Sequence, residues 1–200
     1  MYTTLSLIYI PLDDRPCNRL YPQWLAQLQP EIMLQVPPAE RLGHKKVAAD
    51  VEWLWHWLEE KIAFNPETIA ILSVEMLVYG GLLPSRLHQH SPTVLQQRLD
   101  RLKTLKQQFP PLKIFASNLL MRCPTYDSSE EEPDYYAEWG AAIFRWGWLQ
   151  DRQIRSHLTP EEEAEWQELQ AKLPTEILED YGRSEEHTSE LQSPYVISYA

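Results

Sequence analysis

Polar side chains that can do acid–base chemistry follow three apolar stretches of this sequence. The apolar run 5–10 is followed by Asp13, Asp14, Arg15 and Asn18. Two later apolar runs are followed by Glu75, Tyr79 and Arg86, and by Asn118, Arg122 and Tyr126. Strands that end in polar residues are how α/β proteins present their active sites. We therefore expect these residues to share one edge of a sheet.

Two of these carboxylates would suit a glycoside hydrolase. One acid protonates the leaving oxygen while the other acts as base or nucleophile, and their environments must separate the two pKa values. We assign these catalytic roles to Glu75 and to either Asp13 or Asp14, because consecutive residues of an extended chain point to opposite sides. The remaining residues are assigned to substrate binding: Arg15, Asn18, Tyr79, Arg86, Asn118, Arg122 and Tyr126. The sequence thus favours a hydrolase that acts on a carbohydrate-like substrate.

The same residues support two other functions. The carboxylates could bind a divalent cation while Arg15, Arg86 and Arg122 hold a phosphorylated or carboxylated small molecule. Alternatively, the protein is a non-catalytic module that binds a metabolite or a carbohydrate. No histidine stands at zinc-ligand spacing, and His44 falls in a loop, so the sequence names no metal ligand. A divalent cation is the only cofactor that we consider.

Composition and charge limit the partners. The chain has 200 residues, 44% of them hydrophobic and 24% charged, as in an ordinary globular protein. A net charge of -11 disfavours nucleic acid as a partner, because phosphate binding needs a basic face. The apolar run 5–12 is too short to cross a bilayer and lacks the features of a signal peptide. The two cysteines offer no disulfide framework. We expect a cytoplasmic protein without a membrane or nucleic-acid partner.

Four apolar strands alternate with helices over residues 1–127. Strands are expected at 6–10, 31–36, 69–74 and 113–117, and helices at 23–28, 46–63 and 91–109. This alternation predicts an α/β domain with a parallel sheet and right-handed crossovers. Four strand–helix units are about half of a (β/α) barrel, so we expect the first half of a TIM-like barrel. An open doubly wound sheet is the alternative.

An all-helical segment, 128–182, is expected to extend the same domain. An aromatic-rich helix is predicted over 135–155, and another over 174–181. Between them Thr159-Pro160-Glu161-Glu162 forms a capping box that starts a helix to about Lys172. Residues 183–200 lack apolar periodicity and resemble a translated sequencing adapter, so we interpret them as a non-native tail. We accordingly expect the natural chain to be longer and this fragment to be inactive.

Three motifs resemble a known bacterial family. They are Ile-Pro-Leu-Asp-Asp-Arg-Pro-Cys-Asn at 10–18, Ser-Val-Glu-Met-Leu-Val-Tyr-Gly-Gly-Leu-Leu-Pro-Ser-Arg at 73–86 and Asn-Leu-Leu-Met-Arg-Cys-Pro-Thr-Tyr at 118–126. They are similar to the family catalogued as domain of unknown function 4127, over residues 5–182. Members of that family are typically longer and usually have Asp where this chain has Glu75. The resemblance implies no reaction, so the hydrolase interpretation rests on the residues themselves.

Overall fold

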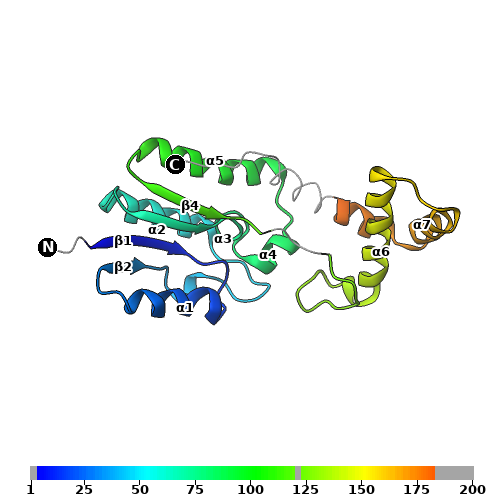
Figure 1. Ribbon diagram of the computed structural model, residues 1–200, viewed down its shortest axis with the longest axis horizontal. Coiled ribbons are helices and arrows are strands. Elements are labelled where there is room, and N and C mark those ends of the chain that lie inside the picture. Colours follow the sequence, from blue (N-terminus) through cyan, green and yellow to red (C-terminus); the bar gives the residue numbers. More distant parts are fainter. Residues whose placement is uncertain (1–3, 120–122, 183–200) are drawn as a thin grey trace. The chain divides into compact units, whose positions relative to one another are not determined.

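The computed structural model describes residues 4–119 and 123–182. The chain divides into two compact units, with the boundary after Leu119 (Figure 1). The first unit is the α/β part and the second is helical. Residues 123–127, which the sequence analysis placed in the α/β domain, belong to the helical unit. The tail 183–200, predicted to be non-native, lies outside the described residues, and so does Arg122.

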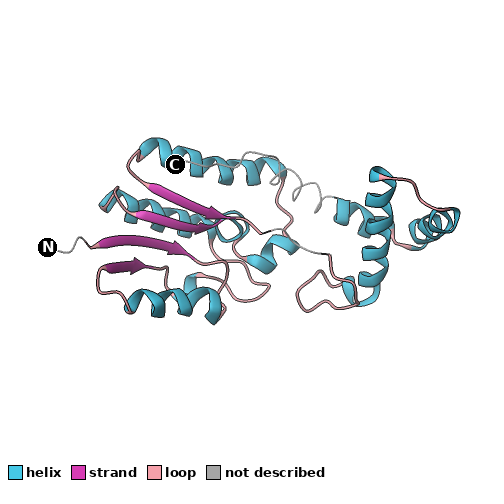
Figure 2. Ribbon diagram, in the orientation of Figure 1, coloured by secondary structure: helices cyan, strands magenta, loops and turns pink. Residues whose placement is uncertain are grey.

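The first unit is built on a four-stranded parallel sheet (Figure 2). Its strands are β1 (Leu5–Ile10), β2 (Ile32–Gln35), β3 (Ile69–Ser73) and β4 (Lys113–Ser117). The strand order is β2-β1-β3-β4, with Ile10 opposite Leu72 and Ser73 opposite Ser117. The carboxyl ends of β1, β3 and β4 therefore lie side by side. The predicted α/β class and its parallel sheet are confirmed.

This strand order is not that of a barrel half. In a TIM-like barrel each strand pairs with the next, so β2 would lie between β1 and β3. Here β1 lies between β2 and β3 and pairs with both, because the connection from β2 to β3 crosses back over β1. The order is that of the doubly wound sheet that was the alternative. Such sheets bind ligands beyond the carboxyl ends of the strands where the order reverses, which here is between β1 and β3.

The helices of this unit are α1 (Pro16–Gln27), α2 (Val51–Phe64), α3 (Val74–Tyr79), α4 (Leu82–Leu87) and α5 (Pro92–Gln108), with a 3-10 turn at Ala39–Arg41. Helix α5 begins at Pro92 after the Ser91 cap, as predicted, whereas α1 and α2 begin at other residues than those predicted. Pro16 opens α1, because proline is favoured in the first turn, and Pro22 lies inside the helix instead of starting it. Helix α2 begins after Asp50, whose carboxylate accepts the Trp53 N–H. Residues 46–49 therefore remain outside the helix.

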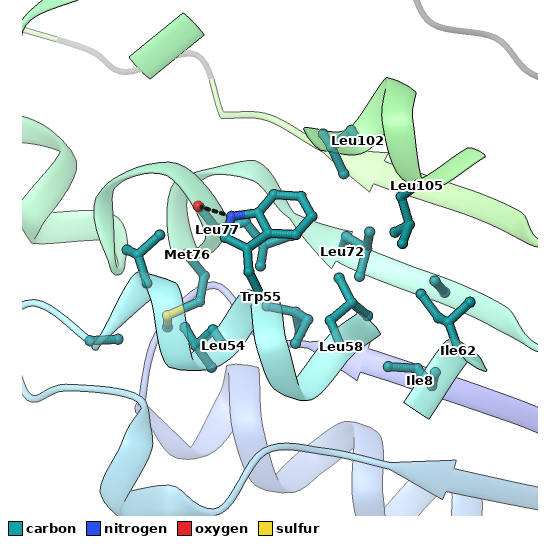
Figure 3. Close-up of a cluster of buried hydrophobic side chains, with 14 of the residues drawn as sticks. Ile8, Leu54, Trp55, Leu58, Ile62, Leu72, Met76, Leu77, Leu102 and Leu105 are labelled. Atoms are coloured by element: carbon teal, nitrogen blue, oxygen red, sulfur yellow. Dashed lines mark hydrogen bonds between the residues drawn. The ribbon is translucent and has the colours of Figure 1, made fainter. Parts of the chain in front are cut away.

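Helices α2 and α5 bury one face of the sheet (Figure 3). The buried cluster joins Ile8, Ala70 and Leu72 of the sheet to Leu54, Trp55, Leu58 and Ile62 of α2 and to Leu102 and Leu105 of α5. Each large apolar side chain buried in this way contributes about 1.5–3 kcal/mol. The Trp55 indole N–H donates to the Leu77 carbonyl at 2.9 Å, so the ring is buried without losing a hydrogen bond. Among the described residues this cluster includes none from α1, which packs against β2.

The helical unit has a hydrophobic core of its own. It contains α6 (Tyr136–Arg155), α7 (Pro160–Lys172) and a further helical stretch, 175–182. Tyr136, Ile143 and Trp146 of α6 pack with Leu173 and Ile177. The predicted capping box is present: Thr159 Oγ1 accepts the Glu162 N–H at 3.3 Å, and the Glu162 carboxylate accepts the Thr159 N–H at 2.9 Å. None of the helices in the described ranges has the length and apolar character needed to cross a membrane.

Candidate functional site

Asp13 closes the turn between β1 and α1. Its Oδ1 accepts the Arg15 backbone N–H at 3.1 Å and the Asn18 side-chain amide at 2.7 Å. Its Oδ2 accepts the Arg15 Nε–H at 2.7 Å. The carboxylate thus lies at the N-terminus of α1, where the helix dipole stabilises negative charge. Three of the predicted site residues are therefore together, and they bind one another.

Asp14 reaches a partner far away in the sequence. Its Oδ2 lies 2.7 Å from Nδ1 of His44. The Asp14 side chain is 25% exposed and that of His44 is 71% exposed, so solvent and solutes reach the imidazole. A carboxylate at Nδ1 favours the tautomer with its proton there, which leaves Nε2 as the basic nitrogen. The pair can therefore accept a proton from a molecule bound at this edge.

The turn 43–47 positions His44. His44 and Val47 exchange two backbone hydrogen bonds, of 2.9 and 2.8 Å. Gly43 has a φ of 70°, and a Cβ there would lie 2.4 Å from the Val47 carbonyl oxygen, so only glycine fits. Lys45 also has a positive φ, of 49°. Val47, predicted to lie in the buried stripe of a helix, is 69% exposed because it belongs to this turn.

The loop between α3 and α4 packs against the segment that follows this turn. The Ala49 N–H donates to the Gly80 carbonyl at 2.9 Å. Gly80 has a φ of 89°, and a Cβ there would lie 2.8 Å from the Ala49 nitrogen. The next residue, Gly81, faces the turn after β1, since a Cβ on it would lie 3.9 Å from the Leu12 carbonyl oxygen. Three loops thus meet where the strand order reverses.

Glu75 is the one predicted catalytic carboxylate that the structure buries, with 3% of the residue exposed. Its Oε2 accepts the Ser73 hydroxyl proton at 2.9 Å, and its Oε1 accepts the Leu119 backbone N–H. The side chain therefore connects the end of β3 to the segment after β4. These contacts indicate a structural role, and catalysis by Glu75 stays a prediction.

Tyr79 and Arg86 lie on the two short helices after β3. Tyr79 is 5% exposed, and burial together with the nearby Glu75 carboxylate raises the pKa of its phenol to about 12. Its ring centroid lies 4.8 Å from that of His88, which holds the ring against the α4–α5 loop. Arg86 is half-buried in the last turn of α4. Tyr79 thus keeps its proton at neutral pH and can only donate or accept a hydrogen bond.

The residues predicted from the fourth strand are divided between the units. Asn118 is exposed directly after β4, at the same edge as the other loops. Tyr126 belongs to the helical unit and is 54% exposed. Arg122 lies outside the described residues. The first unit therefore brings together the predicted residues of β1 and β3 with Asn118.

No group of three or more His, Cys, Asp or Glu side chains that could hold a metal ion is found within 4–119 and 123–182. Near Asp13, the Tyr9 hydroxyl donates to the Asn18 carbonyl at 2.8 Å. Burial, and then the charges of Asp13 and Cys17, raise the pKa of Tyr9.

His44 is the basic side chain that the structure adds to the residues predicted for this site, because its imidazole contacts Asp14.

A family model described as "Protein of unknown function (DUF4127)" matches residues 7–196. The chain belongs to the DUF4127 family. The resemblance seen in its three motifs is thereby confirmed. Searches of curated proteins and of solved structures returned no match.

In this DUF4127 chain two of the three motifs form neighbouring loops of the site. The motif 10–18 provides the turn that holds Asp13 and Asp14, and the motif 73–86 provides the buried Glu75 and the Gly80 loop. His44 stands outside all three motifs. The sequence contains only a weak signal for His44. Gly43 before it indicates a turn, but nothing local connects that turn to Asp14, which lies 30 residues earlier.

Proposed function

We propose that this DUF4127 protein is a hydrolase that acts on a carbohydrate-like substrate at the carboxyl edge of its sheet. One observation carries the proposal, the 2.7 Å contact between Asp14 and His44. The pair lies next to the point where the strand order reverses, which is where doubly wound proteins bind their ligands.

In the proposed reaction His44 acts as a general base. Its Nε2 takes a proton from a water molecule, and the water oxygen forms a bond to the reacting carbon of the substrate. The bond from that carbon to the leaving oxygen breaks, its electron pair stays on that oxygen, and the oxygen takes a proton from solvent water while the His44 imidazolium later returns its proton to solvent. Asp14 stabilises the imidazolium that forms, as the aspartate of a catalytic triad does. General base catalysis of this kind contributes about 10²–10⁴-fold in rate.

The charges at the site favour a neutral substrate that carries hydroxyl groups. In many doubly wound proteins the first helix N-terminus binds a phosphate. Here the Asp13 carboxylate lies at that end of α1, and Asp14 adds a second negative charge nearby. Arg15, which the phosphate hypothesis assigned to the substrate, has its Nη2 2.6 Å from Asp13 Oδ2. Carboxylate oxygens accept hydrogen bonds from sugar hydroxyls, so these charges support the carbohydrate hypothesis over the anionic one.

The two cysteines support a proposal about the compartment in which the protein works. Cys17 and Cys123 are not joined in a disulfide. Cysteines outside disulfides are typical of proteins in a reducing compartment. We therefore place the proposed hydrolase in the cytoplasm.

The decisive experiment compares two histidine variants. His44→Asn removes the base, whereas His56→Asn removes an exposed histidine of α2 and serves as the matched control. A panel of chromogenic glycosides is tested with this chain and with a longer family member that has both Asp14 and His44. We expect His44→Asn to lower turnover by about 100-fold or more without abolishing sugar binding. His56→Asn should behave as wild type.

Three outcomes would redirect the proposal. Unchanged turnover in His44→Asn would refute the general-base role. Sugar binding without turnover in both proteins would favour the non-catalytic module. Turnover that a chelator abolishes and magnesium restores would favour the metal-dependent alternative.

A further inference from the structure

Glu75 holds the backbone of the segment that leaves β4. The residue is 3% exposed, and its Oε1 accepts the Leu119 N–H while its Oε2 accepts the Ser73 hydroxyl proton. Glu75 takes part in none of the ion pairs of the described residues. Burying a carboxylate without a cation costs free energy that its hydrogen bonds must offset. A carboxylate binds an N–H group roughly twice as strongly as a neutral acceptor does, so the contact fixes the backbone at Leu119.

Asn118 lies between two residues that are held in place. Before it, Ser117 ends β4, and its Oγ lies 3.4 Å from the Leu72 carbonyl oxygen. After it, Leu119 donates its N–H to Glu75. Asn118 itself is exposed, and its side-chain amide makes no hydrogen bond to any residue of the described chain. A group that can both donate and accept is therefore presented to solvent on a fixed backbone, which suits it to bind the hydroxyl groups of a sugar.

Asn118 lies to one side of the proposed catalytic pair. The strands β1, β3 and β4 end at the same edge of the sheet, in that order (Figure 2). Neighbouring strands are about 4.8 Å apart, so the ends of β1 and β4 are about 10 Å apart. Asp14, which contacts His44, follows β1, whereas Asn118 follows β4. This separation exceeds the width of one sugar ring and is close to the length of a disaccharide.

We propose that Asn118 binds a second sugar unit of the substrate and that Glu75 positions Asn118 for this contact. The inference rests on the proposed function, which supplies the class of ligand and places the reacting bond at His44. The substrate is accordingly a disaccharide or a longer glycan. Glu75 touches neither the reacting bond nor the sugar, and it acts through the backbone of Leu119.

Amide hydrogen exchange in the full chain tests the link between Glu75 and the segment that carries Asn118. Glu75→Gln keeps the shape of the side chain but removes its charge, so we expect the Leu119 amide to exchange about 10-fold faster than in wild type. The amides of β1 should keep their wild-type rates. Glu67→Gln is the matched control, because Glu67 is exposed before β3, at the opposite edge of the sheet. An unchanged rate at Leu119 in Glu75→Gln would overturn the proposal.

Sugar binding tests the link between Asn118 and the second sugar unit. The His44→Asn variant of the full chain, in which bound sugar is not hydrolysed, is titrated and followed by NMR. The probes are glucose with cellobiose and maltose, and N-acetylglucosamine with chitobiose. We expect at least one disaccharide to bind about 10-fold more tightly than its monosaccharide. Adding Asn118→Ala should abolish this preference, and adding Glu75→Gln should lower it by about 3-fold. Adding Asn65→Ala, at the end of α2 and the opposite edge of the sheet, should leave it unchanged.

The outcomes separate this inference from the proposed function. A variant that is only less stable would keep the preference for the disaccharide, because both sugars need the same folded protein. Equal affinity for the two sugars, no binding of any probe, or a preference that survives Asn118→Ala would overturn the inference, even where His44→Asn lowers turnover. A preference that Asn118→Ala abolishes would support the second sugar site, and turnover that does not depend on His44 would then refute only the general base.

Discussion

Nδ1 of His44 lies 2.7 Å from Oδ2 of Asp14, across 30 residues of sequence. The contact joins the turn after β1 to the turn before α2. It gives Nδ1 of the imidazole a fixed partner, and in the proposed function Nε2 is the nitrogen that acts on the substrate. The effect of this contact on the His44 tautomer can be measured without knowing the substrate.

Asp14→Asn should reverse the tautomer of His44. An amide that donates to Nδ1 leaves the proton on Nε2, and the base is lost. We expect nitrogen NMR to show the His44 proton moving from Nδ1 to Nε2, and turnover to fall by about 10²–10⁴-fold, no more than on loss of the base itself. Asp100→Asn is the control, because Asp100 is on α5 and pairs with Lys103. An unchanged tautomer in Asp14→Asn would show that the carboxylate does not orient the imidazole.

Glu75→Ala should destabilise the first unit. It leaves the Ser73 hydroxyl and the Leu119 N–H without their acceptor, so the free energy of unfolding in urea should fall by about 2–3 kcal/mol. Glu75→Asp keeps the charge but shortens the reach, and a smaller loss is expected. Lost turnover with wild-type stability in Glu75→Ala would instead support the catalytic role predicted from the sequence.

Tyr79 should make stability depend on alkaline pH. Its folded pKa of about 12 exceeds the ordinary value of 10.0, so the folded state holds the proton more tightly than the unfolded state. This stabilisation is complete below pH 10 and is lost as the pH rises toward 12, by about 2 kcal/mol. The shift in pKa sets the range to be measured, pH 9 to 12. Over this range the free energy of unfolding should depend less on pH in Tyr79→Phe than in wild type. Tyr126→Phe, which alters an exposed tyrosine, should keep the wild-type slope.

Gly80→Ala should disturb the site through the backbone. The φ of 89° is unfavourable for alanine, and its Cβ would meet Ala49 backbone atoms. We expect a loss of about 1–3 kcal/mol in the free energy of unfolding. The His44 NMR signals should shift as well, because Ala49 follows the turn that carries His44. Gly182→Ala is the control, since a Cβ there meets nothing within 4 Å. A native His44 spectrum in Gly80→Ala would mean that the two loops are not coupled.

Much of the first unit follows from short-range patterns. The strand predicted at 113–117 has those bounds in the structure, and the Thr159 capping box forms as predicted. The helix predicted from residue 46 begins at Val51 instead, because Asp50 caps it. The short helices α3 and α4 were not predicted, since each has only six residues and so shows little periodicity.

The sequence by itself determined which segments are strands, that the sheet is parallel, and that Asp13, Asp14 and Glu75 follow strands. Those properties depend on apolar runs and on residues close together in the chain. The tertiary structure alone decided the strand order, the burial of Glu75 and the pairing of Asp14 with His44. These depend on the side to which each crossover returns and on packing between distant segments, such as Gly80 on Ala49, which local patterns do not encode.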